Sequence, residues 1–249
     1  MKIALQPTYV LHSRPYRDTS LLLEVFTAEH GRLGLVARGA RRKSRGGSGG
    51  ALLQPFTPLL LSFTGRAELK TLTAVEAAGQ AQVLQGDRLF SGMYLNELLV
   101  RLLHRHDPNP TLFAAYSAAL QSLAAEADVE VSLRRFELRL LEELGYSFDL
   151  AAEGDTGEAV QEDRWYQYHS HCGLVAGDGI AEPSTPAFSG SDLLRMARGQ
   201  FGGEVRQTAK RLLRLALSEH LGGAPLRSRE LFSHGASPPT GGDRDISGH

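Results

Sequence analysis

A change in hydrophobic period near residue 74 constrains the fold of this 249-residue chain more than any other feature. Before it, short apolar runs are separated by turn material, a pattern typical of β-strands. Five short strands with one long excursion between the third and the fourth fit a small closed barrel. The strand-like runs are residues 8–11, 20–26, 33–37, 58–63 and 68–72.

After this point, apolar residues recur at spacings of three and four, which predicts helices. Ser132 is placed to cap the third helix and Gly145 to end it. Gly92 is interpreted as a packing contact. The helices are expected over residues 93–103 with a lead-in at 84–90, and over 111–125, 133–144, 191–198 and 205–221.

The predicted fold class is therefore α+β, with an N-terminal five-stranded OB-fold barrel followed by a mainly α-helical domain that carries a small irregular insertion. The OB-fold is the five-stranded barrel most used for single-stranded nucleic acid. The expected domains are the barrel at 1–80, a helical domain at 81–148, a small acidic irregular subdomain at 149–190 with a short aromatic element at 165–169, C-terminal helices at 191–232 that pack with the helical domain, and a disordered tail at 233–249.

A basic loop interrupts the strand-like runs between residues 38 and 50. It holds five cationic side chains, five glycines and no acidic residue. Arginine and lysine neutralise phosphates and release counterions, and glycines let a backbone approach its ligand closely. The loop therefore suits a polyanion, with a solvated hairpin tip as the alternative.

Charge is distributed unevenly along the chain, although 27 Lys plus Arg nearly balance 28 Asp plus Glu. Residues 1–80 carry a net charge of +6, residues 81–150 carry −4, residues 151–190 carry −6 and residues 191–249 carry +3. A basic surface confined to one module is typical of nucleic-acid binding. The candidate DNA contacts are Arg14, Arg17, Arg32, Arg38, Arg41, Arg42, Lys43, Arg45, Arg66 and Lys70.

Aromatic residues in the same segment give a weaker signal. Tyr16 lies between a proline and an arginine and is the ring best placed to face a bound strand, where bases stack on aromatic side chains. Phe26, Phe56 and Phe63 lie in apolar runs, so we expect them in the interior of the barrel domain.

Motifs for catalysis or for a cofactor are not found in the sequence. It has no phosphate-binding P-loop, and its histidines are scattered. Cys172, the single cysteine, lies close to His169 and His171, but a polar turn is favoured over a zinc site because adjacent residues point in different directions. We expect no catalytic residue, no metal and no cofactor. The start of the chain lacks a long apolar run, which favours a cytoplasmic protein without a membrane partner.

Two arginines near the start of the third predicted helix oppose the helix dipole and so require another explanation. Arg134 and Arg135 could pair with Glu130 and Glu137, or they could bind an external carboxylate. Salt bridges are the favoured interpretation from these residues alone.

The chain closely resembles the RecO family of recombination mediators over about residues 8–232. The resemblance rests on many segments in the same order: VLHSRPY (10–16), TSLLL (19–23), GR (31–32), VARGAR (36–41), LQPFTPL (53–59), ELKTL (68–72), YLNELL (94–99), LRRFE (133–137), LGY (144–146) and RSREL (227–231). It implies an OB-fold, a helical domain and a non-enzymatic role in DNA repair.

The resemblance also implies the partners. RecO proteins bind single- and double-stranded DNA, anneal complementary strands, engage the C-terminal tail of single-stranded DNA-binding protein, and help RecR to load RecA. By this resemblance, Arg134 or Arg135 would supply the cation beside an apolar groove for that tail.

Many family members carry a four-cysteine zinc finger after the LGY motif. Here the aligned positions hold Glu153, Thr156, Ala176 and Gly179, so the chain resembles the zinc-free branch typical of gamma-proteobacteria. Two other functions stay open: a protein-protein scaffold whose basic barrel binds an acidic partner, and a nuclease or other hydrolase, although no motif supports either.

Overall fold

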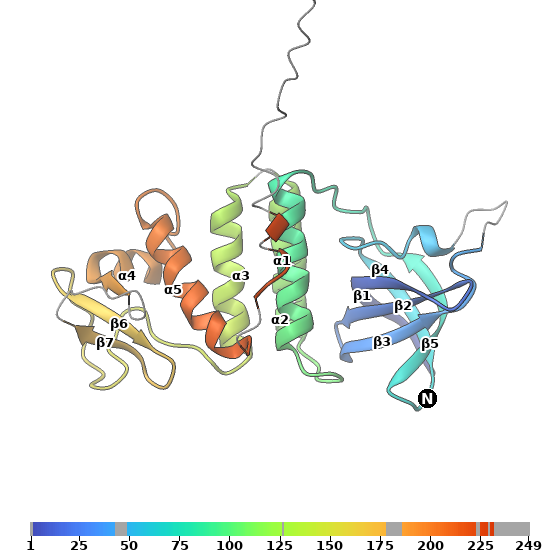
Figure 1. Ribbon diagram of the computed structural model, residues 1–249, viewed down its shortest axis with the longest axis horizontal. Helices are drawn as coiled ribbons and strands as arrows, with labels where there is room; N and C mark the ends of the chain where they lie inside the picture. The colour runs from blue at the N-terminus through green and yellow to red at the C-terminus, as the bar shows by residue number, and fades with distance from the viewer. Residues whose placement is uncertain are drawn as a thin grey trace, which may run out of the picture.

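The N-terminal segment forms a closed five-stranded barrel in the order β1-β2-β3-β5-β4 (Figure 1). All neighbouring strands are antiparallel except β3 and β5, which are parallel, as an OB-fold requires. The strands are β1 (Lys2–Tyr16), β2 (Ser20–Thr27), β3 (Gly31–Ala37), β4 (Leu59–Thr64) and β5 (Leu69–Ala77). This computed structural model describes residues 2–42, 49–125, 127–177, 186–222, 225–228 and 230–231.

Alternation along the strands fills the barrel. Leu23 pairs with Leu35 and Val25 with Leu33, and all four side chains are fully buried in its core. β1 is much longer than the apolar run that predicted it, because its first half does not alternate regularly. The register shifts near Leu5, a non-glycine residue with φ of +50°, so the pattern breaks there while the strand continues.

Five α-helices follow the barrel, within the part of the chain that the structure describes. Asp128, not Ser132, caps the third helix: its carboxylate accepts the Glu130 and Val131 N–H groups, and Ser132 lies inside the helix. Gly145, with φ of +78°, follows the end of this helix as predicted. The helices are α1 (Asp87–Leu102), α2 (Pro110–Ala124), α3 (Val129–Glu143), α4 (Gly190–Ala197) and α5 (Val205–His220).

The segment expected to be irregular contains a small antiparallel sheet instead, in the order β7-β6-β8. Its strands are β6 (Trp165–His169), β7 (Gly173–Gly177) and β8 (Ala187–Ser189). The predicted aromatic element is the central strand, and Tyr166 and Tyr168 bury their rings. Cys172 lies in the turn between β6 and β7.

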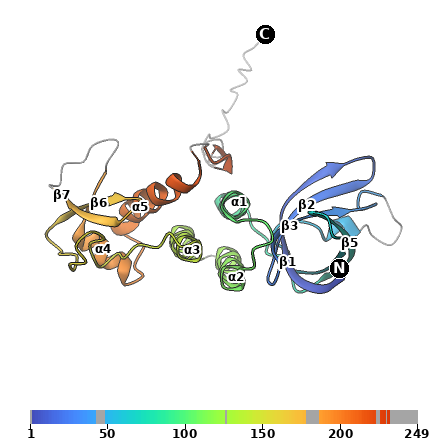
Figure 2. The ribbon, with the colours of Figure 1, turned by 90° about the horizontal axis from the view of Figure 1, so that it is seen from below.

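The helices α1, α2 and α3 lie between the barrel and the end of the molecule that carries β6 and α4 (Figure 2). Tyr9 and Phe26 project from the outside of the barrel and contact Phe113 of α2 with ring centroids 5.5 and 5.4 Å apart. Phe56 packs against Gly92 of α1, where an added Cβ would lie 2.9 Å from its ring. The two domains therefore share a hydrophobic core, which is separate from the core inside the barrel.

This shared core changes the expected position of two rings. Phe63 is inside the barrel as predicted, with no exposed surface. Phe26 and Phe56 are also buried, but they belong to the core that the barrel shares with the helices. The sequence around these two rings does not show that another domain covers them.

The segment after α1 docks on the barrel beside β3. The Arg32 carbonyl accepts the His106 N–H at 2.9 Å, and the Arg32 Nε donates to the Leu103 carbonyl at 3.0 Å. Gly31, with φ of +63°, packs so closely on the Asp107 backbone that an added Cβ would clash with the carbonyl oxygen. These contacts fix the orientation of the barrel on the helical domain.

The C-terminal segment around residue 228 is held on α1 by a carboxylate. Glu97 accepts hydrogen bonds from the Arg227 and Ser228 N–H groups at 2.9 and 2.8 Å and from the Ser228 hydroxyl at 2.6 Å. Leu226 is buried beside them. The predicted packing of C-terminal elements on the helical domain thus has a specific anchor in the described residues. None of the helices described is both long and apolar enough to cross a membrane.

Candidate nucleic-acid interface

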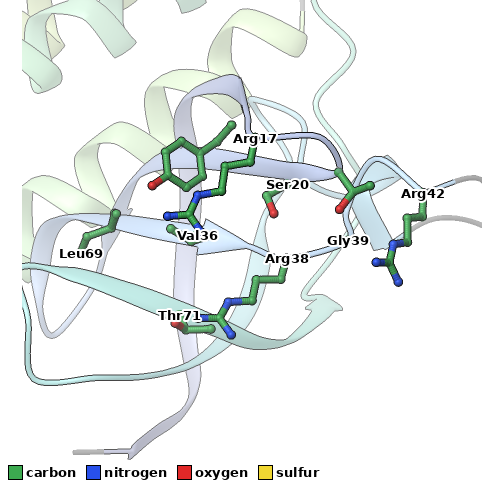
Figure 3. A pocket seen from close by; sticks show the side chains of 10 residues that line it. Arg17, Ser20, Val36, Arg38, Gly39, Arg42, Leu69 and Thr71 are labelled. Carbon is green, nitrogen blue, oxygen red and sulfur yellow. The ribbon is translucent and has the colours of Figure 1, made fainter.

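An open cleft of about 650 Å³ lies on the outer face of the barrel, over β2, β3 and the start of β5 (Figure 3). One wall comes from the β1–β2 turn and another from the first residues of the basic loop. Figure 3 shows Arg17, Arg38 and Arg42 spread along it. The cleft is lined by Tyr16, Arg17, Thr19, Ser20, Val36, Arg38, Gly39, Arg42, Leu69 and Thr71.

Strand register explains why these side chains face outward together. Arg14 pairs with Leu22, Leu22 with Val36, and Val36 with Thr71, so one row crosses four strands. The residues one position away, such as Leu35, point into the barrel core. Arg14 is exposed on this same row and extends the cationic surface beyond the cleft.

The electrostatic character of the cleft is set by unpaired arginines. Arg17, Arg38 and Arg42 are exposed, and none of them forms an ion pair with a carboxylate of the described residues. The cleft lining contains no acidic residue. The Arg17 guanidinium lies 5.2 Å from the centre of the Tyr16 ring, which places a cation and an aromatic face side by side. Phosphates and bases could both find partners there.

The basic loop starts and ends at fixed points beside the cleft. Arg41 donates its N–H to the Thr19 carbonyl at 2.9 Å, which joins the loop to the β1–β2 turn. Gly50 packs so closely against Ala40 that an added Cβ would lie 2.2 Å from its carbonyl oxygen. Arg41 and Arg42 are exposed at this base. The predicted contacts Lys43 and Arg45 lie outside the described residues.

Other predicted contacts differ in their availability. Arg66 is exposed in the β4–β5 turn, and Lys70 is half-buried, with its Nζ donating to the Ala67 carbonyl at 3.4 Å. Arg32 is committed elsewhere: its Nη1 lies 2.6 Å from a Glu24 carboxylate oxygen, and its side chain is only 14% exposed. The structure therefore places Arg32 in the contact between barrel and helical domain, not in the cleft.

The arginine pair on α3 separates into a buried and an exposed member. Arg134 is 5% exposed and lies 2.9 Å from a Glu137 oxygen and 3.7 Å from a Glu130 oxygen. These ion pairs favour the salt-bridge interpretation for Arg134. Arg135 points to solvent and has no ion pair among the described residues, so it alone is free to meet an external carboxylate.

The segment around Cys172 forms the turn of the β6–β7 hairpin, and a turn was expected there. Among the described residues, no group of three or more histidine, cysteine or acidic side chains converges to hold a metal ion. His169, His171 and Cys172 are all exposed, in agreement with a polar turn.

Sequence reasoning missed the uncharged lining of the cleft. Ser20, Val36, Leu69 and Thr71 line the cleft together with the arginines. The signal was present in the alternation of the strands, since Ser20 and Val36 are next to Leu21 and Leu35, which pack in or against the barrel core. The sequence did not show that β5 pairs with β3, and this pairing brings Leu69 and Thr71 beside Val36 in the cleft.

The fold and the cleft define a class of protein: an OB-fold barrel with an open cationic face, joined through a shared core to a helical domain. Two family models match the chain, one described as recombination protein O N terminal over residues 1–81 and one described as recombination protein O C terminal over residues 84–230. The chain belongs to the RecO family, which confirms the resemblance seen in its sequence. Membership supports a role in DNA repair and recombination.

Curated relatives match nearly end to end. The DNA repair protein RecO of Methylococcus capsulatus is 48% identical over 233 residues, which cover 93% of this chain and 93% of that protein. RecO of Pseudomonas aeruginosa PAO1 is 48% identical over 237 residues, with 95% and 97% covered. RecO of Haemophilus influenzae strain 86-028NP is 46% identical over 234 residues, with 94% and 97% covered.

Proposed function

We propose that this protein is a non-enzymatic recombination mediator that binds DNA across the open face of its barrel. It holds single or double strands by their phosphates, anneals complementary strands coated with single-stranded DNA-binding protein, and assists RecR in loading RecA. Annealing requires contacts that hold a backbone without specifying bases, which is what arginines in an open cleft supply.

The observation that carries this proposal is the set of unpaired arginines in the cleft. Arg17 adds a second argument, because its φ of +52° is a conformation that favours glycine and costs a non-glycine residue about 1 kcal/mol. Strained backbone conformations of this kind occur most often at functional sites, where the side chain contacts a ligand. A polyanion beside the Tyr16 ring would be such a ligand.

The partner contact that the proposal includes rests on α3. Exposed Arg135 is the better candidate than buried Arg134 to meet the acidic, apolar tail of single-stranded DNA-binding protein. Reversal of charge at Arg135 should therefore weaken tail binding, measured with the tail peptide, while the Arg134 ion pairs stay intact. Unchanged tail binding by Arg135→Glu would remove this residue from the proposal.

The DNA site is tested by the salt dependence of binding to single-stranded oligonucleotide. Each phosphate contact adds about 0.7 to the slope of log affinity against log salt for single strands. The double variant Arg17→Ala, Arg38→Ala should have a slope that is smaller by about 1.4. Its loss of affinity between 50 and 200 mM salt should therefore be roughly sevenfold smaller than that of the wild type. The matched control, Arg164→Ala with Arg198→Ala, removes two exposed arginines, one directly before β6 and one directly after α4. Both elements lie at the opposite end of the molecule from the barrel (Figure 1).

Function is tested by annealing of complementary oligonucleotides precoated with single-stranded DNA-binding protein. The cleft variant and a loop variant with Arg41, Arg42, Lys43 and Arg45 changed to Ala should anneal slowly, and the control should match the wild type. Full annealing by both variants would move the DNA site elsewhere. A wild type that neither anneals nor binds with a steep salt dependence would favour the scaffold alternative.

A further inference from the structure

One arginine of the helical domain lies on the barrel face next to the cleft. Arg105, in the segment after α1, reaches over Gly34 of β3, and an added Cβ at Gly34 would lie 3.2 Å from its Nη1. The same Cβ would lie 3.1 Å from Leu69 Cδ1, and Leu69 lines the cleft. Arg105 can occupy this position because residue 34 has no side chain.

Strand register places this arginine in line with the cleft. Gly34 pairs with Leu69 and lies two residues before Val36, whose side chain lines the cleft. Two residues of strand span about 7 Å, and Arg38 lies two further residues along the chain, directly after β3 ends at Ala37. Arg105 therefore continues the row of cations that begins at Arg38, about 13 Å away along the strand.

Two carboxylates hold Arg105 in place, and they differ in exposure. Its Nη2 lies 2.8 Å from Glu24, whose side chain is 16% exposed and also binds Arg32. Its Nε lies 3.5 Å from Glu68, whose side chain is 71% exposed in the β4–β5 turn. An exposed ion pair of this length is weak and readily exchanged for another anion, whereas the Glu24 contact is shorter and more shielded.

We propose that Arg105 is a further DNA-binding residue and that Glu68 occupies the place of a phosphate until DNA arrives. The inference rests on the proposed function of the cleft and extends its path onto the helical domain. On binding, the Arg105 guanidinium keeps its contact with Glu24 and exchanges Glu68 for a phosphate oxygen. Arginine suits this exchange because its planar fork carries donors for two anions at once. Glu68 thereby favours ligands able to displace it.

Neighbouring charges support this position as an anion site. His106 lies beside Arg105 and Lys70, and partial burial together with these two cations lowers its pKa, although Glu68 and Glu24 act in the opposite direction. Lys70 and Arg105 are therefore both close enough to His106 for their charges to affect its protonation. A phosphate there would face Arg105, and His106 is the next residue along the chain.

The test measures single-stranded oligonucleotide binding against salt for three substitutions. Arg105→Ala should reduce the slope by about 0.7, so that its loss of affinity between 50 and 200 mM salt is roughly 2.6-fold smaller than that of the wild type. Arg105→Lys should keep the slope, since lysine also binds phosphate. Glu68→Gln should bind DNA more tightly than the wild type.

The matched control is Glu76→Gln, which removes the same charge from an exposed residue of β5 far along the strand from the cleft. Glu68→Gln should tighten binding more than this control does, and the difference should vanish when Arg105 is alanine. Equal tightening by both glutamine variants, or an unchanged slope in Arg105→Ala, would overturn the inference. Because Glu68 is exposed, its variant tests the idea even if Arg105→Ala unfolds.

The cleft variant Arg17→Ala, Arg38→Ala is measured in parallel. If it loses slope while Arg105→Ala does not, only the extension to the helical domain fails. If neither loses slope, the cleft itself is not the DNA site, and the proposed function fails with it.

Discussion

Arg32 lies on β3 and Arg38 directly follows that strand, and the structure gives the two arginines opposite roles that experiment can separate. Arg32 donates to the Leu103 carbonyl and pairs with Glu24 at 2.6 Å, with side chains 14% and 16% exposed. Arg38 is exposed in the cleft and forms no ion pair with the described residues. Replacement by alanine should therefore affect stability at one position and DNA binding at the other.

The size of the Arg32 effect follows from what would be lost. A hydrogen bond that involves a charged group contributes about 1.5–3 kcal/mol. Breaking a buried pair can cost about 3–5 kcal/mol, but Glu24 keeps its contact with Arg105, so the full penalty is not reached. We expect Arg32→Ala to lower the free energy of unfolding by about 2–3 kcal/mol, which for a chain of this size lowers the thermal midpoint by about 5–10 °C.

The assay combines thermal unfolding with the salt dependence of oligonucleotide binding. Arg32→Ala should lower the thermal midpoint and keep the salt slope, whereas Arg38→Ala should keep the midpoint and lose about 0.7 from the slope. A variant Arg32→Ala that loses slope at an unchanged midpoint would refute the reasoning. That result would return Arg32 to the DNA contacts predicted from the sequence.

Three further predictions concern buried and titrating groups. Tyr116→Phe should lower the free energy of unfolding by about 1–3 kcal/mol in denaturant titrations, because it leaves the buried Asn96 Oδ1 without its hydroxyl donor; a change below 0.5 kcal/mol would contradict this. Burial opposes ionisation of Glu97, but hydrogen bonds led by the Ser228 hydroxyl outweigh it and lower the Glu97 pKa below 4.5. The C-terminal segment should therefore stay docked above pH 4.5 and lose amide protection as pH falls through the lowered pKa, a dependence that Glu97→Gln should abolish. Burial and nearby cations lower the His106 pKa below 6.5; NMR titration should show this pKa rising when DNA binds, and a constant value would place the phosphate elsewhere.

Much of the barrel and of the helical domain could be predicted because their signals are local. Five strands followed from apolar runs, and helix positions from spacings of three and four. The small sheet was missed because β8 has three residues, too few for a periodic pattern. Ser132 was predicted as the cap of the third helix, but Asp128 lies one turn earlier and is an equally good capping residue, so the sequence does not distinguish the two.

The site was predicted less completely than the fold, for a different reason. Charge indicated that the first 80 residues suit a polyanion, but not which of their arginines remain free of ion pairs. Arg32 forms an ion pair with Glu24 and Arg134 forms one with Glu137, so neither is free to bind a partner. Arg105 reaches the outer face of the barrel from the helical domain. Such assignments depend on contacts between distant residues, which composition and periodicity do not contain.

The ring contacts between barrel and helices also bear on how the protein can be dissected. The two family models meet near residue 82, which suggests two portable modules. The hydrophobic core does not divide there, because Tyr9, Phe26 and Phe56 belong to the same core as residues of α1, α2 and α3. A fragment that ends at residue 81 would carry these rings on its surface and self-associate. The boundary between the two family models is therefore a poor place to divide the chain. The two parts are recognisable separately in the sequence, but we expect them to fold stably only together.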